Sequence, residues 1–211
     1  MCGIIGIISE EDVSSSIYES LTVIQHRGQD AAGMATLEDG KLHVRKQIGL
    51  VREVFRAQHI KNLKGKMGIG HVRYPTAGGV TREFSQPLYV NSPYGISICH
   101  NGNLVNSKEL TQELYENDLR HLNTDSDSEV ILNIFANEMQ KINSQSPSPE
   151  EIFSAVEKMH LRLKGAYSVV LMISGVGLLA IRDPNGIRPL MMGKKENDLL
   201  GKTDYMFASE S

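Results

Sequence analysis

The chain opens on a short apolar run that starts directly behind Met1. Residues 2–9 contain four isoleucines and two glycines, and because the run is too short for a helix we expect a buried strand. Met1 is normally removed when the following side chain is small. The sequence therefore predicts that Cys2, at the end of this strand, becomes the first residue of the mature protein.

A first-position cysteine would carry a thiol and a free α-amine on the same carbon. A thiol attacks only as a thiolate, and because its unperturbed pKa is near ~8.5 it needs a base. The α-amine, with a pKa of about 7.7–8, can accept that proton. The alternative is that Cys2 is simply a small apolar residue in a buried strand, and its position alone does not separate the two interpretations.

Strands and helices are expected in groups along the rest of the chain. A capping box of Ser16 and Glu19 predicts a helix that ends at Gly28, and a hairpin over 33–46 is expected to turn at 39–40. Because grouped elements favour stacked antiparallel sheets over a parallel doubly wound sheet, we expect an α+β fold. Further strands are expected at 67–73, 95–100, 166–174, 178–181, 187–192 and 205–209, and further helices after Asn106, Ser126 and Ser148.

Composition excludes several classes of function. The chain has 211 residues, a net charge of -3 and a pI near 6.2, which argue against a nucleic-acid surface. Two cysteines and no apolar run of about 20 residues indicate a reducing cytoplasm rather than secretion or a membrane. We expect one domain over 1–211, truncated at its C-terminal end because a domain rarely stops directly after a strand.

Two polar segments follow expected strands. Arg73 opens a loop rich in Pro, Thr and Gly, a setting that presents an arginine to a small anion; the alternative is a surface ion pair. Asn101 and Gly102 follow an apolar strand and could direct an amide side chain and a backbone N–H toward one oxyanion. A simple Asn-Gly turn is the alternative for that pair.

An acidic cluster precedes one of the expected helices. Asp125, Asp127 and Glu129 alternate with serines like the start of a calcium loop, but the glycine required at the sixth position is missing. Most of the cluster is expected to cap the helix, and one remaining carboxylate could hold an ammonium group. His100 paired with Cys2 in a thiol–imidazole dyad is a rival mechanism, and Cys99 is expected to lie in the core.

Taken in order, the motifs resemble the glutaminase domain of the amidophosphoribosyltransferase family, which are class II glutamine amidotransferases. The resemblance covers the whole chain. Arg-Tyr-Pro-Thr-Ala-Gly separates this family from the sugar-phosphate aminating relatives, which carry Trp after the arginine. The motifs are Cys-Gly-Ile-Ile-Gly at 2–6, His-Arg-Gly-Gln-Asp at 26–30, Gly-His-Val-Arg-Tyr-Pro-Thr-Ala-Gly at 70–78, His-Asn-Gly-Asn at 100–103 and Asp-Pro-Asn-Gly-Ile-Arg-Pro-Leu at 183–190.

The resemblance implies an N-terminal-nucleophile hydrolase fold, a four-layer α-β-β-α sandwich with two antiparallel sheets between helix layers. It implies hydrolysis of L-glutamine to glutamate and ammonia through a glutamyl thioester. It also assigns roles to residues of this sequence: nucleophile Cys2 with its α-amine as base, oxyanion donors Asn101 and Gly102, substrate-binding residues Arg73, Asp127 and Thr76, and supporting residues Arg27, Gly28 and Tyr74.

The same resemblance implies a partner domain whose motifs do not occur in residues 1–211. Family members carry a C-terminal phosphoribosyltransferase domain that binds phosphoribosyl pyrophosphate with Mg²⁺ and makes 5-phosphoribosylamine in the first step of purine biosynthesis, and no motif for that ligand occurs here. We expect no cofactor or metal in this chain and a homo-oligomer at full length; an iron–sulfur cluster stays open. The loop over 73–84 is expected to act as a lid. Alternatives are the glutaminase domain of another amidotransferase and a non-catalytic domain of this fold.

Overall fold

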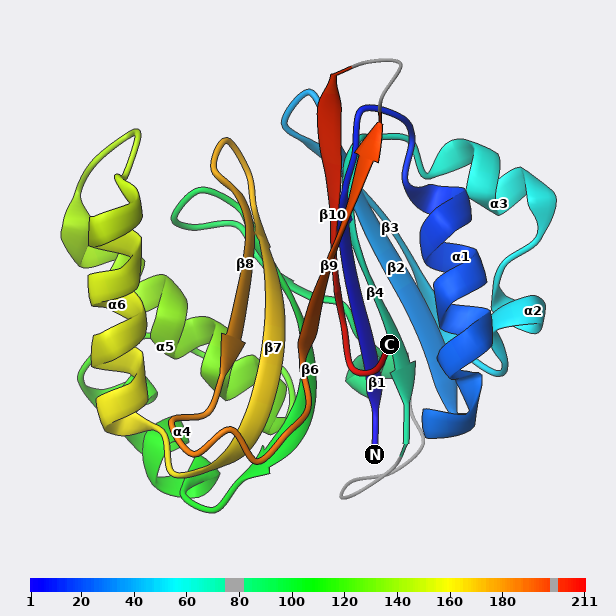
Figure 1. The fold of residues 1–211 in the computed structure, drawn as a ribbon. Helices are drawn as coiled ribbons and strands as arrows, with labels where there is room; N and C mark the ends of the chain where they lie inside the picture. The colour runs from blue at the N-terminus through cyan, green and yellow to red at the C-terminus, as the bar shows by residue number, and fades with distance from the viewer. Residues whose placement is uncertain (75–81, 198–200) are drawn as a thin grey trace.

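Two antiparallel sheets stack face to face between two layers of helices, as Figure 1 shows. This computed structural model describes residues 1–74, 82–197 and 201–211. The architecture is the four-layer α-β-β-α arrangement, so the expected fold class is confirmed. The larger sheet has the strand order β3-β2-β4-β1-β10-β9 and the smaller one β5-β6-β7-β8.

The strand that begins the chain lies in the interior of the larger sheet. β1 (Gly3–Ile8) pairs with β4 (Met67–Arg73) on one side and with β10 (Lys202–Ala208) on the other. The remaining strands of that sheet are β2 (Ala31–Glu38), β3 (Lys41–Ile48) and β9 (Met191–Asn197), and the smaller sheet contains β5 (Leu88–Val90), β6 (Ile96–Leu104), β7 (Gly165–Ile173) and β8 (Gly177–Arg182).

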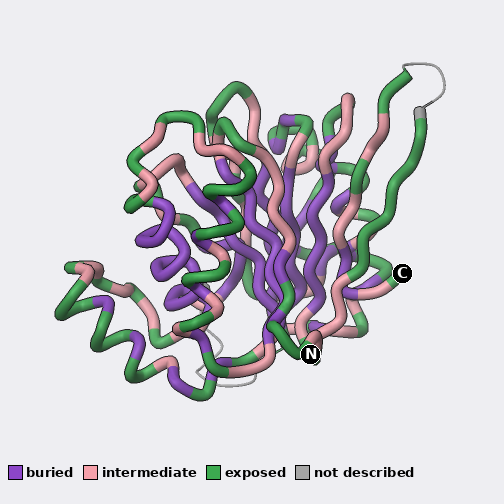
Figure 2. Tube along the Cα trace, turned by 60° about the vertical axis from the view of Figure 1, so that its left-hand side comes forward, coloured by how far each residue is buried: buried purple, intermediate pink, exposed green. Residues whose placement is uncertain are grey.

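Each sheet has its own helix layer. The outer face of the larger sheet packs against α1 (Ser14–Val23), and the short helices α2 (Val51–Val54) and α3 (Ala57–Asn62) lie on the same side. The smaller sheet is covered by α4 (Ser107–Glu116), α5 (Asp127–Ile142) and α6 (Pro149–Arg162). Figure 2 shows that the buried backbone concentrates in the central strands and in α5.

A third apolar cluster fills the space between the sheets. Ile4 and Ile69 of the larger sheet meet Cys99 and Val170 of the smaller one, and all four are fully buried. A side chain on Gly6 would come within 2.5 Å of Val170 Cγ1, so the sheets approach closely at this point. Cys99 therefore belongs to the core, as expected from the sequence.

Local signals explain several boundaries. Asp39 and Gly40 have φ values of 48° and 76°, which is the conformation of a two-residue hairpin turn between strands of right-handed twist. The Ser148 hydroxyl accepts from Glu151 N–H at 3.3 Å, and the Glu151 carboxylate accepts from Ser148 N–H at 2.8 Å. This capping box begins α6 where the sequence placed it.

Two expectations about elements are wrong. α1 begins at Ser14 rather than at a capping box of Ser16 and Glu19, and no side chain caps it. The strand expected at 187–192 starts only at Met191, because the Asp183 carboxylate takes the N–H groups of Ile187 and Arg188 and Pro189 has none to offer a ladder. The elements α2, α3 and β5 were not expected.

Replacing Leu21 by alanine tests the helix layer over the larger sheet. Leu21 is fully buried on α1, whereas Val23 on the same helix is 74% exposed. We expect Leu21→Ala to lower the free energy of unfolding by about 2–5 kcal/mol through lost burial and a residual cavity. Val23→Ala, the matched control, should change it by less than about 0.5 kcal/mol in urea unfolding. Equal effects would contradict this packing.

Candidate functional site

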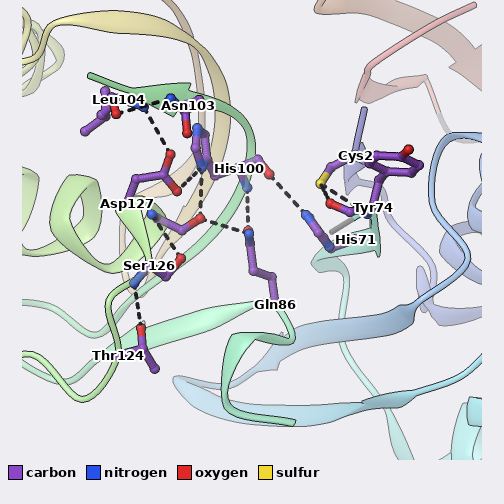
Figure 3. Close-up of polar contacts among 11 residues, drawn as sticks. Cys2, His71, Tyr74, Gln86, His100, Asn103, Leu104, Thr124, Ser126 and Asp127 are labelled. Carbon is purple, nitrogen blue, oxygen red and sulfur yellow. Dashed lines mark hydrogen bonds and ion pairs between the residues drawn. The ribbon is translucent and has the colours of Figure 1, made fainter. Parts of the chain in front are cut away.

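Cys2 lies at the sheet end where β1 begins, next to the last residues of β4. Its thiol contacts the backbone of Tyr74, accepting from the N–H at 3.4 Å and donating to the carbonyl at 3.6 Å. Tyr74 as a whole is 53% exposed, and its contacts with the Cys2 thiol come from its main chain. Figure 3 shows the pair beside the strand end.

The surroundings of the Cys2 thiol shift its pKa in both directions. Burial raises the pKa of Cys2, and the Tyr74 N–H, the chain-terminal ammonium and Arg73 lower it only in part. Asp127 acts in the same direction as burial. Because the net effect raises the pKa, the thiol is protonated at neutral pH and needs a base at short range before it can attack.

Arg27 and Gly28 support this corner from the other side. Arg27 Nε donates to the carbonyl oxygen of Cys2 at 3.1 Å. A Cβ on Gly28 would lie 2.5 Å and 2.6 Å from the carbonyl carbon and oxygen of Arg73, which leaves no room for any larger residue. Gly28 thus lets the short 3₁₀ turn Ile24–Arg27 pack directly on the end of β4.

Arg73 is a buried cation at the end of β4. Only 6% of the residue is exposed, and its guanidinium lies 3.4 Å from an Asp30 carboxylate oxygen and 5.4 Å from the centre of the Phe84 ring. The ion pair and the ring hold the planar group in one orientation. Arg73 lies at the end of its strand, as expected from the sequence, and the contacts with Asp30 and Phe84 were not expected.

Asn101 and Gly102 lie on β6 in the facing sheet. Cys99 points into the space between the sheets, and strand alternation puts Asn101 on the same face. Asn101 is 1% exposed, and its amide nitrogen has no partner in the described part of the chain. A Cβ on Gly102 would lie 2.2 Å from the Ala166 carbonyl oxygen, so only glycine fits there. A buried amide donor without a partner is costly unless a ligand uses it.

Asp127 is the first residue of α5. One of its carboxylate oxygens accepts from Leu104 N–H at 3.1 Å, and the other lies 3.6 Å from His100 Nδ1. Ser126 caps the helix by accepting from Ser128 N–H at 3.3 Å. Glu129 instead holds the preceding loop by accepting from the N–H groups of Asn123 and Thr124. The expected division is therefore only partly right, because Ser126 rather than an acidic residue caps the helix and two carboxylates, Asp125 and Asp127, line the cavity.

Hydrogen bonds join β6 to the start of α5, and Figure 3 shows two of the residues that make them, Gln86 and His100. The Gln86 carboxamide accepts from His100 N–H at 2.7 Å and donates to Ser128 Oγ at 2.9 Å. Ser128 Oγ also lies 2.8 Å from His100 Nδ1. Among the described residues no hydrogen bond joins His100 to Cys2, and burial lowers the pKa of His100. The geometry therefore gives the rival dyad no support.

His71 connects the two sheets beneath the site. It is 1% exposed on β4, and its Nε2 lies 3.0 Å from the carbonyl oxygen of His100. Burial lowers the pKa of His71 to about 3, so the ring is neutral and Nε2 carries the donated proton. Through this bond the peptide that precedes Asn101 is fixed against the strand that carries Arg73.

Several of these residues line one cavity of about 260 Å³ between the sheet ends, but Asn101 is not among the described residues of its lining. Its volume is at the small end of ligand pockets, which run from about 300 Å³ upward, and suits a small metabolite. Its lining includes Cys2, Arg73, Gly102, Asp125 and Asp127. A cation and carboxylates in one cavity with a thiol are the groups needed to hold an amino acid at a nucleophile.

Part of the expected site lies outside the described residues. Thr76 and most of the loop over 73–84 fall in 75–81. No cluster of three or more His, Cys, Asp or Glu side chains in the described ranges is arranged to hold a metal ion. None of the described helices combines the length and apolar character needed to cross a bilayer.

Known proteins are similar to this chain in sequence. The glutamine amidotransferase domain family matches residues 79–211. An amidophosphoribosyltransferase from Pseudomonas aeruginosa is 54% identical over 100% of this chain and 42% of its own length. The Escherichia coli amidophosphoribosyltransferase is 52% identical over 100% of this chain and 42% of its own length.

A solved structure agrees with the sequence relatives. The glutamine phosphoribosylpyrophosphate amidotransferase from B. subtilis, complexed with ADP and GMP, superposes with a TM-score of 0.80 at 34% identity. The match covers 99% of this chain and 42% of that one. This chain thus spans less than half the length of these curated relatives.

The neutral state of His71 predicts a loss of stability in mild acid. The unfolded histidine titrates near ~6.5 and the folded one at about 3, so the unfolded chain binds the extra proton as the pH falls between these values. Stability should be complete above about pH 6.5, with a loss of roughly 2 kcal/mol by pH 5 from this group. In urea unfolding, His71→Gln should remove this residue's contribution to the fall of the free energy of unfolding with decreasing pH. Substitution of the exposed His121 (His121→Gln) should leave that contribution in place. An unchanged slope in His71→Gln would refute the assignment.

Proposed function

The chain belongs to the glutamine amidotransferase domain family and corresponds to the glutaminase part of amidophosphoribosyltransferases, and from this premise we propose that it hydrolyses L-glutamine at Cys2. The carrying observation is that Cys2, Arg73, Gly102 and Asp127 line one small cavity. An intact set of this kind favours a catalytic domain over a non-catalytic one of the same fold.

Recognition of glutamine rests on its two charges. A free amino acid is a zwitterion, so a selective site needs one fixed cation and one fixed anion. We assign the α-carboxylate to Arg73, which Asp30 and Phe84 hold in place, and the α-ammonium to Asp127, which Leu104 N–H orients. Thr76 is assigned to substrate binding by the family resemblance alone.

The chemical step begins with proton transfer from the thiol. The raised pKa of the buried Cys2 thiol makes a base necessary, and we assign this role to the α-amine that removal of Met1 would expose. The sulfur then bonds to the side-chain amide carbon of glutamine, and the carbonyl oxygen becomes an oxyanion. Asn101 Nδ2, buried and without a partner among the described residues, and Gly102 N–H are the donors assigned to it.

Two further steps complete the turnover. The tetrahedral intermediate collapses as the C–N bond breaks, and the proton held by the α-amine passes to the departing nitrogen, which leaves as ammonia. Water then adds to the glutamyl thioester with the amine again as base, and C–S cleavage releases glutamate and restores the thiol. Each proton taken up is therefore returned within one cycle.

The activity of the whole protein is a further part of the proposal. The relatives are amidophosphoribosyltransferases of more than twice this length, so we propose that residues 1–211 are the glutaminase domain of such an enzyme. A C-terminal phosphoribosyltransferase domain would bind phosphoribosyl pyrophosphate with Mg²⁺ and use the ammonia to make 5-phosphoribosylamine, the first step of purine biosynthesis. A cytoplasmic homo-oligomer without nucleic-acid or membrane partners completes this proposal.

Replacing Cys2 tests the nucleophile, with the other cysteine as matched control. Cys2→Ala should lower glutamate release from glutamine by at least about 10³-fold, because a methyl group cannot form the thioester. Cys99→Ala, in the core between the sheets, should keep activity within a few-fold. Intact mass should show the glutamyl adduct only where Cys2 and a free α-amine are both present. Equal release by both variants would exclude the proposed nucleophile.

Neutralising Asp127 tests the ammonium site. Asp127→Asn removes the charge but retains an oxygen that can accept from Leu104 N–H. We expect kcat/KM for glutamine to fall about 10–100-fold, mainly through KM, because a charge-assisted contact to the substrate is lost. Asp125→Asn, on the same cavity wall, is the control and should change KM by less than about threefold. The assignment fails if Asp125→Asn raises KM more than Asp127→Asn.

A further inference from the structure

The segment after β10 returns to the strand that carries the nucleophile. Ser209 N–H donates to the Ile4 carbonyl at 3.1 Å, and Ser209 Oγ accepts from Ile4 N–H at 2.9 Å. Ser209 is fully buried. These two bonds extend the pairing of β10 with β1 and bring the next residue, Glu210, to the corner occupied by Cys2.

Arg27 bridges Glu210 and Cys2. Its Nε donates to the Cys2 carbonyl at 3.1 Å, and its Nη1 lies 3.1 Å from Glu210 Oε2. The Arg27 side chain is 9% exposed, while that of Glu210 is 33% exposed. His26 pairs with the other Glu210 oxygen at 2.7 Å, on the solvent side, and its side chain is 65% exposed. Exposure of the side chains thus falls in the order His26, Glu210 and Arg27, and Arg27 contacts Cys2.

The charge of Arg27 is only partly balanced. Nε contacts an uncharged carbonyl, Nη1 contacts the carboxylate, and Nη2 is buried without a hydrogen-bond partner in the described part of the chain. This buried cation is hydrogen-bonded to the carbonyl next to the Cys2 α-carbon. It therefore favours the deprotonated forms of the thiol and the α-amine, which that carbon carries. Glu210 acts in the opposite direction, from farther away.

We propose that the Arg27–Glu210 ion pair sets the pH at which Cys2 becomes reactive, with Arg27 favouring the deprotonated nucleophile and Glu210 limiting that effect. This inference rests on the proposed glutaminase function. Neither residue is in the cavity lining among the described residues, so both act on Cys2 rather than on the substrate. Glu210 is a positioning residue in this scheme and Arg27 carries the charge.

Other charged groups face Cys2 from the neighbouring elements. Arg73 at the end of β4 and the chain-terminal ammonium favour the thiolate, and Asp127 at the start of α5 disfavours it. Asp30 pairs with Arg73 at 3.4 Å. Arg73 and Asp127 line the cavity and Asp30 contacts Arg73, whereas the Arg27–Glu210 pair contacts the Cys2 carbonyl from outside the cavity lining.

The test is the pH dependence of kcat/KM for glutamate release, whose acid limb reports ionisation of the free enzyme. A nearby charge shifts the pKa of the α-amine and that of the thiol in the same direction. The direction in which the acid limb moves therefore does not depend on which of the two groups it reports. Glu210→Gln should move the acid limb to lower pH by a few tenths of a unit to about one unit. Arg27→Gln should move it to higher pH by a similar amount.

Two further variants separate charge from geometry. Arg27→Lys keeps the cation but loses the Nε contact with the Cys2 carbonyl, so the limb should stay in place while the plateau of kcat/KM falls several-fold. His26→Gln, which touches only the outer oxygen of Glu210, is the matched control and should leave limb and plateau unchanged. The wild type and Cys2→Ala are measured alongside on the full-length protein.

The outcomes are distinguishable. Opposite shifts in Glu210→Gln and Arg27→Gln support the inference. Shifts in the same direction, or lowered plateaus with no shift in either variant, overturn it and leave the pair a structural contact. Glutamate release that does not depend on Cys2 overturns the proposed function instead, because the wild-type comparison reports on that question alone.

Discussion

The structure depends on how firmly the first strand is held. β1 pairs with β4 and with β10, so both of its edges carry backbone hydrogen bonds, and its two faces pack against α1 and the smaller sheet. The first residues of a chain normally fray, but here they lie between two neighbouring strands of a sheet. A nucleophile at this place has a defined position relative to the cavity, and a base on its own α-carbon would need no additional element to position it.

The facing sheet supplies the rest of the site through equally rigid parts. Gln86, Ser128 and His71 hold His100, the residue before Asn101, at its N–H, its ring and its carbonyl. Asp127 starts a helix whose buried face reaches into the core. The site is therefore formed between two preassembled surfaces rather than on one loop. Such an arrangement favours catalysis by position and by oriented donors, since little reorganisation is needed at the moment of reaction.

Sequence patterns predicted the fold class and the main site residues for identifiable reasons. The short apolar run at 2–9, the turn at Asp39 and Gly40 and the Ser148 capping box are local signals, and the structure contains the elements they predict. Polar residues after strand ends pointed to Arg73 and Asn101, and an acidic cluster before a helix, together with the family resemblance, pointed to Asp127. The strand expected at 187–192 failed because a side chain, Asp183, captured its N–H groups.

Other parts of the site could not be predicted because their partners are distant in the chain. Arg27 and Glu210 are 183 positions apart, and Gln86 acts on a strand and a helix at once. No local pattern distinguishes Glu210 and Gln86 from ordinary surface side chains, and Arg27 was expected only from the family resemblance. Short helices such as α2, with four residues, have no periodicity long enough to detect.

The pairing of β1 with β10 has a consequence for biosynthesis. Ile5 lies opposite Ala208, so the earliest strand to leave the ribosome acquires its second neighbour only when almost all 211 residues have been made. Contacts of such long sequence separation form late. A nascent chain therefore carries the Cys2 thiol long before the larger sheet that positions it is complete.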